Sequence, residues 1–343
     1  MRAERIHQTG GPAAFKNDKV PLPKPGRGEY LIEVHYAGVN PVDIKIRKGE
    51  FAPYRPKLPA VLGRDISGVV RECGPRGTKG GFKVGTSVFG MLDYDRGAYA
   101  EFTLASDREI VAVPKRLKEK EAGALGVAAL TAWQGLFDHG RLKKGQRVLI
   151  HGAAGGVGHF AVQFAKVRGA TVVATASERD LGWVKDLGAD QVIDFKNERF
   201  EEHTGQIDLV FDLVGGETQK RSWSVLKRRG GTLVSTLAEP SSVEAARRKA
   251  RAFRMVVKGN SKQLKTIASL VARGRVRVAI DKVFLLQKVG QAHRYLGAAH
   301  PRGKVVLDAT PGWADLGRVA ATEEPAELAM VANEVLARFP PFY

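Results

Sequence analysis

The stretch VLIHGAAGGVG at residues 148–158 places an apolar strand, a glycine loop and the start of a helix in immediate succession. At such a loop the free N–H groups and the positive end of the helix dipole converge, and glycines let an anionic pyrophosphate approach closely. From Gly152 the glycines follow the spacing G-x-x-G-x-x-G, and a second apolar strand, Thr171–Thr175, comes after the helix. The complete βαβ unit predicts dinucleotide binding; a turn that needs glycine only for packing is the alternative. The N–H groups predicted to meet the pyrophosphate belong to Gly155, Gly156, Val157 and Gly158.

The end of the second strand indicates which dinucleotide binds. NAD sites usually carry an Asp or Glu there, which accepts a hydrogen bond from the ribose 2′-hydroxyl. This chain has a small, uncharged strand end followed by Ser177, Glu178 and Arg179. Ser177 and Arg179 suit a 2′-phosphate, Arg179 through charge-assisted hydrogen bonds. Glu178 turned inward would instead take the NAD role, and Arg179 could be an exposed cation at a helix start. We expect NADPH.

Length and composition bound the class of protein. A chain of 343 residues is too long for one ordinary core, so two domains are expected, and 43% hydrophobic residues indicate a globular protein. No stretch approaches the ~20 apolar residues of a membrane helix, and the polar start MRAER lacks the apolar region of a secretory signal. We therefore expect a cytoplasmic location and no membrane partner. Cys73 is the only cysteine, which excludes an intrachain disulfide and a cysteine cluster for structural zinc.

The net charge of +19 favours anionic ligands. Basic residues are nevertheless scattered, with local concentrations only at Lys227–Arg229 and Arg247–Arg254. A dedicated nucleic-acid surface would gather them on one face with exposed aromatic side chains. We therefore interpret the charge as a solvated basic surface and expect no nucleic-acid partner.

The chain shows two different patterns of expected secondary structure. Up to about Gly126, short strands alternate with loops rich in Pro and Gly, and Lys118–Phe137 then reads as one helix. From Gln146 strands and helices alternate, which is typical of a parallel, doubly wound sheet. The strands expected there are Arg147–His151, Thr171–Thr175, Gln191–Asp194, Leu209–Leu213 and Thr232–Ser235.

The last third changes again. A helix is expected at Ser261–Arg273, followed by strands at Val276–Ile280 and Lys304–Leu307, and we expect the late strand to return to the first domain. In the tail, the apolar spacing over Pro325–Arg338 predicts one more helix, which would pack on the body or on a neighbouring subunit.

Together with the glycine loop, seven segments resemble the zinc-independent quinone oxidoreductases of the medium-chain dehydrogenase/reductase superfamily. The similarity spans about Leu31 to Leu307 and does not reach the tail. In chain order the segments are AGVNPVD (37–43), LGRDISGVV (62–70), GAYAEF (97–102), LTAW (130–133), LGADQVID (187–194), DLVGG (212–216) and RGKVVL (302–307).

The resemblance implies an α/β protein with a GroES-like β-rich catalytic domain and a Rossmann doubly wound parallel-sheet domain that binds NADPH. We expect residues 1–126 and 258–310 in the catalytic domain, residues 127–257 in the Rossmann domain, and 311–343 as a C-terminal extension. It further implies a homodimer that reduces quinones or α,β-unsaturated carbonyls. Zinc alcohol dehydrogenases of the superfamily carry a cysteine ligand near Asn40 and a histidine ligand near Arg64; neither is present, so no metal site is expected.

The same resemblance suggests residues for the site. It places Asn40 near the nicotinamide and Tyr54 near the substrate, where Tyr54 could orient an oxygen or supply a proton. The alternatives are that Asn40 bonds its own backbone before Pro41 and that Tyr54 packs on nearby prolines. Arg64 and Asp65 are interpreted as a structural ion pair, and His151 as a core histidine with a fixed tautomer. The residues that the resemblance brings to the nicotinamide half are Thr131, Val214, Leu237 and Lys304.

Without a Lewis acid, the hydride acceptor must already be activated by conjugation, as quinones and enones are. An NADPH-dependent quinone or enone reductase is therefore the first hypothesis. A reductase of enoyl thioesters is the alternative among enzymes, because a basic cleft rim suits a long anionic acyl carrier. An RNA- or polyanion-binding protein that keeps the dinucleotide fold is the alternative of another class.

Overall fold

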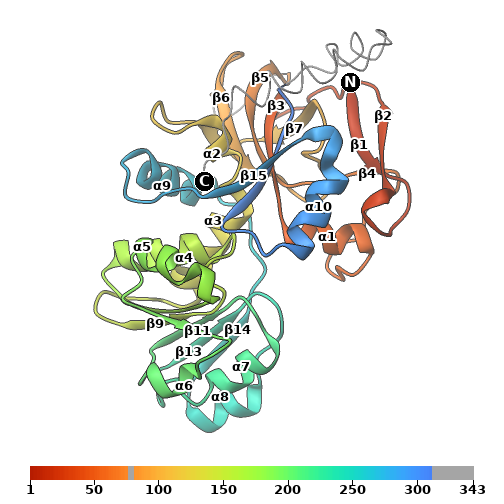
Figure 1. Ribbon diagram of the computed structural model, residues 1–343. Coiled ribbons are helices and arrows are strands. Elements are labelled where there is room, and N and C mark those ends of the chain that lie inside the picture. The colour runs from red at the N-terminus through yellow and green to blue at the C-terminus, as the bar shows by residue number, and fades with distance from the viewer. Residues whose placement is uncertain (76–80, 311–343) are drawn as a thin grey trace.

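The computed structural model describes residues 1–75 and 81–310 of the chain. Figure 1 shows two bodies, an upper one built from both ends of the described chain and a lower one built from its middle. The upper body holds strands β1–β8, β15 and β16, and the lower body holds β9–β14. The expected pairing of a β-rich part with a parallel-sheet part is confirmed.

The lower body is a parallel sheet in the order β11-β10-β9-β12-β13-β14. Alternate side chains pack on opposite faces: Val148 and Ile150 join one core cluster, and Leu149 joins another. The five strands expected here are confirmed. A sixth, β14, follows them at the sheet edge, where the basic sequence RAFR gave no continuous apolar signal. The strands are β9 (Arg147–Ile150), β10 (Thr171–Ala176), β11 (Gln191–Asp194), β12 (Leu209–Asp212), β13 (Thr232–Ser235) and β14 (Arg251–Arg254).

Helices cover both faces of this sheet (Figure 1). The first begins at Gly158, directly after the glycine loop, and ends at Gly169 in the left-handed conformation that favours glycine. After β10 the chain forms a 3₁₀ turn, Glu178–Asp180, that runs into an α-helix. The helices are α4 (Gly158–Arg168), α5 (Leu181–Asp186), α6 (Phe200–His203), α7 (Gly216–Ser222) and α8 (Ser242–Arg248).

The upper body contains a seven-stranded sheet in the order β15-β16-β3-β5-β6-β8, with β7 also paired to β3, and a smaller sheet β2-β1-β4. The late strand β16 pairs antiparallel with β3, Val305 opposite Val39, so its expected return to the first domain is confirmed. The strands are β1 (Arg2–Ile6), β2 (Phe15–Lys19), β3 (Glu29–Val39), β4 (Ala60–Val61), β5 (Asp65–Cys73), β6 (Ser87–Met91), β7 (Phe102–Ser106), β8 (Ile110–Ala112), β15 (Ile280–Leu285) and β16 (Lys304–Asp308).

Two expected elements differ from the structure. The single helix over Lys118–Phe137 is divided near Gly123, and a π-helical turn, Gln134–His139, replaces its last part. The break lets Gly126 sit against the upper sheet, where a Cβ would lie 2.4 Å from the Asp65 carboxylate. The helices of the upper body and of the junction are α1 (Pro41–Lys48), α2 (Glu119–Ala122), α3 (Gly126–Trp133), α9 (Ser261–Ala272) and α10 (Val289–Ala298), with 3₁₀ turns at Pro12–Ala14 and Leu286–Lys288.

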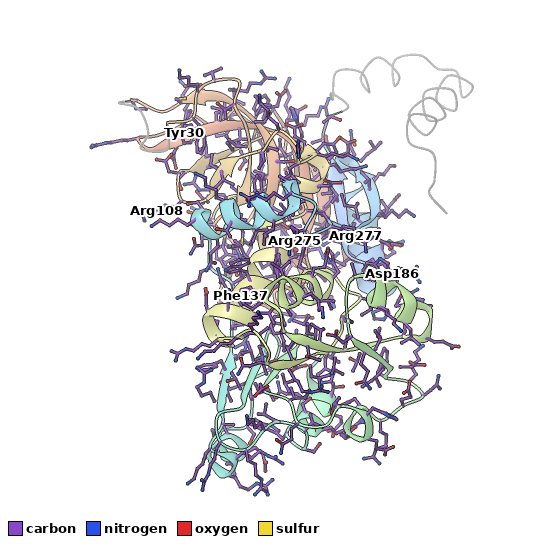
Figure 2. All side chains as sticks on the ribbon, turned by 90° about the vertical axis from the view of Figure 1, so that its left-hand side faces the viewer. Tyr30, Arg108, Phe137, Asp186, Arg275 and Arg277 are labelled. Carbon is purple, nitrogen blue, oxygen red and sulfur yellow. The ribbon has the colours of Figure 1, made fainter. Side chains whose placement is uncertain are left out.

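The strand expected over Val276–Ile280 is the second difference, because β15 begins only at Ile280. The backbone of Arg277 bonds instead to a helix side chain: its N–H donates to Gln163 Oε1 (2.7 Å) and its carbonyl accepts from Gln163 Nε2 (3.0 Å). The Arg277 guanidinium donates to the carbonyl of Asp186 (2.8 Å), and Figure 2 shows both residues at the junction of the bodies. This segment is thus a strap across α4 rather than a strand.

One hydrophobic core joins the two bodies. Phe89 and Met91 of β6 belong to the same buried cluster as α3 and the lower-sheet residue Ile150. This core runs through α3 without a gap, so packing alone marks no boundary between the two bodies. The expected domain boundaries, at residues 126/127 and 257/258, therefore stay a prediction. No helix in residues 1–75 and 81–310 is long and apolar enough to cross a membrane. The helix expected over Pro325–Arg338 lies outside the described residues.

Candidate functional site

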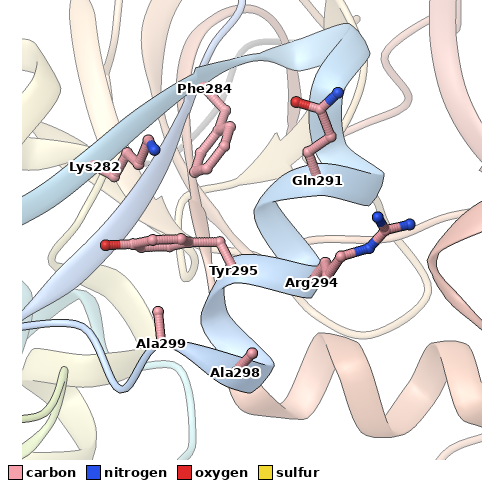
Figure 3. A pocket seen from close by; sticks show the side chains of 7 residues that line it. All are labelled: Lys282, Phe284, Gln291, Arg294, Tyr295, Ala298 and Ala299. Atoms are coloured by element: carbon pink, nitrogen blue, oxygen red, sulfur yellow. The ribbon is translucent and has the colours of Figure 1, made fainter.

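A cleft of about 1500 Å³ is lined by residues of both bodies. It runs from the glycine loop and the end of β10 to the start of α1 and the β5 end of the upper sheet. A second, shallow hollow of about 480 Å³ lies over α10 and β15 (Figure 3). Its one lysine, Lys282, is covered by the rings of Phe284 and Tyr295, at 5.3 and 5.0 Å from their centroids. The cleft is therefore the candidate site.

The glycine loop is shaped by close backbone packing. Gly152 adopts a φ of +71°, which side chains disfavour, and a Cβ on Gly158 would lie 2.2 Å from the Gly152 carbonyl oxygen. The Gly303 N–H donates to the Ala154 carbonyl (2.9 Å), so the turn before β16 is tied to the loop. All four predicted pyrophosphate residues, 155–158, line the cleft at the N-terminus of α4. The strand–loop–helix geometry expected from the sequence is present.

At the end of β10 the structure brings Ser177 and Arg179 together through a buried acid, Asp180. Ser177 Oγ donates to Asp180 (2.6 Å), Arg179 Nε lies 3.2 Å from the same carboxylate, and Arg302 Nε donates to its other oxygen (2.5 Å). Burial favours a raised pKa for Asp180, but these hydrogen bonds outweigh it and hold the pKa below the usual value. Arg179 also donates to the carbonyl of His300 (2.6 Å). Two arginines are thus fixed at this end of the cleft by one carboxylate.

Two buried polar side chains that line the cleft, Asn40 and Lys304, are bonded to the buried Asp65 behind them. We call these three residues the floor cluster. Lys304 Nζ lies 2.5 Å from Asn40 Oδ1, 3.2 Å from Asp65 Oδ2 and 3.4 Å from the carbonyl of Val39. Asn40 Nδ2 donates to Asp65 Oδ2 (2.9 Å), and the Val127 N–H donates to Asp65 Oδ1 (2.6 Å). Asp65 pairs with Lys304, so the interpretation of an Arg64–Asp65 ion pair is wrong. Side chains of neighbouring strand residues point to opposite faces, which separates Arg64 from Asp65.

Asp43 supports the floor cluster from below. Its Oδ2 accepts from the Asn40 N–H (2.8 Å) and from the Tyr99 hydroxyl (2.9 Å), while its Oδ1 is buried without a partner. Burial raises the pKa of Asp43 from 3.8 to about 6, against the lowering effect of these two hydrogen bonds. Asn40 therefore has its backbone and its side chain both fixed, at the N-cap of α1.

Aromatic side chains close the upper end of the cleft. Tyr94 lines the cleft, and the Arg64 guanidinium carbon lies 3.8 Å from the centre of its ring. Tyr54 stacks on Tyr94 with ring centroids 5.2 Å apart and does not belong to the cleft lining that the structure describes. The catalytic role expected for Tyr54 stays a prediction. Tyr94 was not expected at the site, because a lone tyrosine in the loop after β6 carries no pattern.

The other predicted cofactor residues line the cleft. Val214 and Leu237 both line the cleft and are 48% and 38% exposed, unusually high for apolar residues. Val214 Cγ2 lies 3.3 Å from the Cβ position of Gly152 in the glycine loop, and Leu237 Cβ lies 3.5 Å from the Cβ position of Gly215. Thr131 Oγ1 donates to the Val127 carbonyl (2.6 Å). Further lining residues that sequence patterns did not single out are Phe195, Lys196, Met255, Val256 and Val257.

His151 agrees with its interpretation as a fixed core histidine. It is fully buried, with Nδ1 3.1 Å from Thr175 Oγ1 and Nε2 2.9 Å from Ser222 Oγ. Burial lowers its pKa to about 4, so the ring is neutral at pH 7. Cys73 lies half-buried at the end of β5, with its Sγ 3.6 Å from the Phe82 carbonyl.

The residues at the cleft do not fit a zinc ion. Within residues 1–75 and 81–310, no three His, Cys, Asp or Glu side chains lie together as a metal site requires. By the family resemblance, Asn40 and Arg64 stand where zinc enzymes of the superfamily would carry ligands. An arginine head group and an amide committed to Lys304 offer no substitute donor set.

Comparison with known proteins agrees with this fold over most of the chain. Family models described as "Alcohol dehydrogenase GroES-like domain" and "Zinc-binding dehydrogenase" match residues 26–115 and 187–307. A 2-methylene-furan-3-one reductase of Solanum lycopersicum is 36% identical, over 85% of this chain and 74% of its own length. A quinone oxidoreductase of Coxiella burnetii superposes with a TM-score of 0.83 at 35% identity, covering 90% of this chain and 99% of its own. The Escherichia coli quinone oxidoreductase in complex with NADPH has a TM-score of 0.81 at 25% identity, covering 90% and 100%.

A GroES-like sheet placed over a dinucleotide-type parallel sheet, with one cleft between them, defines a medium-chain dehydrogenase/reductase. The chain is an oxidoreductase of the NAD(P)H-dependent kind. Within that superfamily it belongs to the quinone oxidoreductase family.

Gly158 provides the sharpest test of the loop. Substitution by Ala places a Cβ 2.2 Å from the Gly152 carbonyl and 2.6 Å from Ala153 Cα, so the loop must open. Such overpacking costs about 1–3 kcal/mol, and Gly158→Ala is expected to raise the dissociation constant for NADPH about tenfold or more, measured by fluorescence titration. Gly182→Ala is the control, because a Cβ there meets only open space and the residue lies outside the cleft. Equal affinity in Gly158→Ala and the wild type would show that the loop does not hold the pyrophosphate.

Proposed function

We propose that the chain reduces quinones or α,β-unsaturated carbonyl compounds with NADPH. The observation that carries the proposal is the continuity of the cleft, in which the glycine loop, the exposed apolar side chains Val214 and Leu237, and Asn40 and Lys304 of the floor cluster line one space. A hydride donor bound along the loop and an acceptor on the floor would therefore be held against each other.

The residues present fit NADPH. The cradle at Gly155–Gly158 leaves no room for a side chain at Gly158, and the N-terminus of α4 faces the cleft, which suits a pyrophosphate. Val214 and Leu237 would cover the nicotinamide half, next to Thr131 and Lys304. The cofactor supplies the hydride, while these side chains orient it and exclude water.

The far end of the cleft suits a 2′-phosphate. Arg179 and Ser177 lie there, held by Asp180, and Lys196 lines the same end. Glu178 is exposed and also lines the cleft, so an acidic group is at hand. Two cations, Arg179 and Lys196, nevertheless favour a ribose that carries a 2′-phosphate over one with a free 2′-hydroxyl. Their attraction for a doubly charged phosphate is larger than for a neutral hydroxyl.

The acceptor side favours conjugated substrates. The acceptor end of the cleft holds cationic nitrogen groups, those of Lys304 and Arg64, and no metal donor set within the described residues, so nothing there polarises a simple ketone as a Lewis acid does. Quinones and enones spread the charge of an added hydride onto oxygen, where hydrogen-bond donors suffice. The relative from Solanum lycopersicum is named as a reductase of an enone, and the one from Coxiella burnetii as a quinone oxidoreductase.

The homodimer and the cytoplasmic location implied by the resemblance stay predictions. The outer edge of β14 pairs with no strand of the described chain, which leaves an edge free for a second subunit.

A panel of acceptors tests the proposed function. The purified protein is mixed with NADPH and, in turn, a quinone, an enone, an enoyl thioester and a simple ketone, and cofactor absorbance is followed. We expect oxidation of NADPH with the quinone or the enone and none with the ketone. If only the enoyl thioester is reduced, the substrate class is enoyl thioesters and not quinones or enones. No turnover with any acceptor, together with tight and salt-sensitive RNA binding, would overturn the proposal that the chain is a reductase.

Arg179→Ala tests the choice of cofactor. Loss of a charge-assisted hydrogen bond to the 2′-phosphate is expected to lower the ratio of kcat/KM for NADPH over NADH about tenfold. Lys265→Ala removes an exposed cation of α9 outside the cleft and should leave the ratio unchanged. An unchanged ratio in Arg179→Ala would mean that Arg179 stays on Asp180 and does not bind the phosphate.

A further inference from the structure

Arg64 is a buried arginine at the end of the cleft where the acceptor would bind. It directly precedes β5, and it is 4% exposed yet lines the cleft. Its position is fixed by Leu92, whose N–H donates to the Arg64 carbonyl (2.7 Å) and whose carbonyl accepts from Arg64 Nε (2.9 Å). Tyr94 covers one side of the guanidinium. The side chain is therefore held rigidly, with its head group at the cleft.

The charge of this head group is not neutralised. Arg64 Nη1 is buried without a hydrogen-bond partner, and no Asp or Glu of the described chain forms an ion pair with it. The adjacent acid, Asp65, is committed to Lys304, Asn40 and the Val127 N–H. A buried cation without a counterion is costly, so it calls for an explanation. Arg47 shares this burial but lies outside the cleft, whereas Arg64 lines the cleft, where a bound molecule can complete its hydrogen bonds.

The rest of the floor has no such free donor. The Lys304 ammonium faces three oxygens, those of Asn40, Asp65 and Val39, which match its three hydrogens. The amide oxygen of Asn40 accepts from Lys304, and its nitrogen donates to Asp65. The floor cluster thus satisfies its own hydrogen bonds, and the neighbouring Arg64 is the cation of the acceptor end whose guanidinium is left for a bound molecule.

We propose that Arg64 is a catalytic residue whose guanidinium donates to the carbonyl oxygen of the acceptor and stabilises the oxyanion formed there. The inference rests on the proposed function. In the step, the β-carbon of an enone takes a hydride from NADPH, the C=C electron pair shifts, and the carbonyl oxygen becomes an enolate held by Arg64. A proton from water then adds to the α-carbon, which leaves the saturated carbonyl and NADP⁺. A quinone takes the hydride at one carbonyl oxygen, its ring electrons shift to give an oxyanion at the other, and a proton from water on that oxygen completes the hydroquinone.

Kinetics of three variants give the first test. Arg64→Met keeps the length and loses the donors, and we expect kcat/KM to fall about 10²-fold, as for loss of an oxyanion donor. Arg64→Ala should fall as far and regain activity when guanidinium chloride is added at low concentration. Arg47→Met is the matched control: Arg47 is also a buried arginine with unpartnered nitrogens, but it does not line the cleft. It should keep kcat/KM even where its Tm falls.

A second readout is independent of turnover. 4-Nitrophenol mimics the oxyanion, and its phenolate is recognised by visible absorption. With NADP⁺ present, the wild type and Arg47→Met should bind it as phenolate with a lowered pKa, and Arg64→Met should bind it at least tenfold more weakly. NADPH affinity, measured in parallel, should be the same in all three proteins.

The outcomes separate the two claims. If the wild type reduces no acceptor in the panel, the proposed function fails, and phenolate binding still decides whether Arg64 holds an oxyanion. If the wild type reduces an acceptor while Arg64→Met keeps its kcat/KM and its phenolate affinity, the role of Arg64 is overturned. If kcat/KM falls in Arg64→Ala and guanidinium does not restore it, while Arg64→Met still binds the phenolate as the wild type does, the role of Arg64 in catalysis is also overturned. Arg64 would then only support the structure around Leu92.

Discussion

A buried ion pair between Lys304 and Asp65, completed by Asn40, is the constraint on which the rest of the structure depends. Its members come from β16, β5 and the start of α1, and the Val127 N–H adds α3 to the same carboxylate. Burying two charges costs several kcal/mol unless every donor and acceptor is satisfied. Here the ammonium and the carboxylate are fully bonded, so the cluster joins segments separated by 239 residues at a point that tolerates little displacement.

The placement of the cleft follows from this junction. β16 begins at Lys304, and the residue before it, Gly303, is bonded to Ala154 of the glycine loop. One short segment therefore fixes the distance between the loop that suits the pyrophosphate and the floor that faces the acceptor. The continuous core through α3 holds the two sheets at that distance. Because the floor cluster satisfies its own hydrogen bonds, chemistry toward the acceptor is left to neighbouring groups, among them Arg64.

The local part of this arrangement could be predicted from sequence, and the long-range part could not. The strand, the glycine loop and the helix at 147–168 are contiguous, so their spacing alone predicted both their structure and a dinucleotide. Arg64 and Asp65 are adjacent in sequence and of opposite charge, yet the strand sends them to different partners, and Lys304 takes the acid. The strand expected at Val276–Ile280 failed for a similar reason, because Gln163 of α4 binds the backbone that a strand would have paired. Tyr94 gave no signal, since only the fold brings its ring under Arg64.

The central claim is that the Lys304–Asp65 pair unites the two ends of the chain at the cleft floor, and a double-mutant cycle tests it most directly. Free energies of unfolding are measured for the wild type, Lys304→Met, Asp65→Asn and the double variant. Each single change should cost about 3–5 kcal/mol, because it leaves a buried polar partner uncompensated. The double variant should cost clearly less than their sum, with a coupling energy of about 2 kcal/mol or more. Additive losses, or single losses below about 1 kcal/mol, would contradict the account.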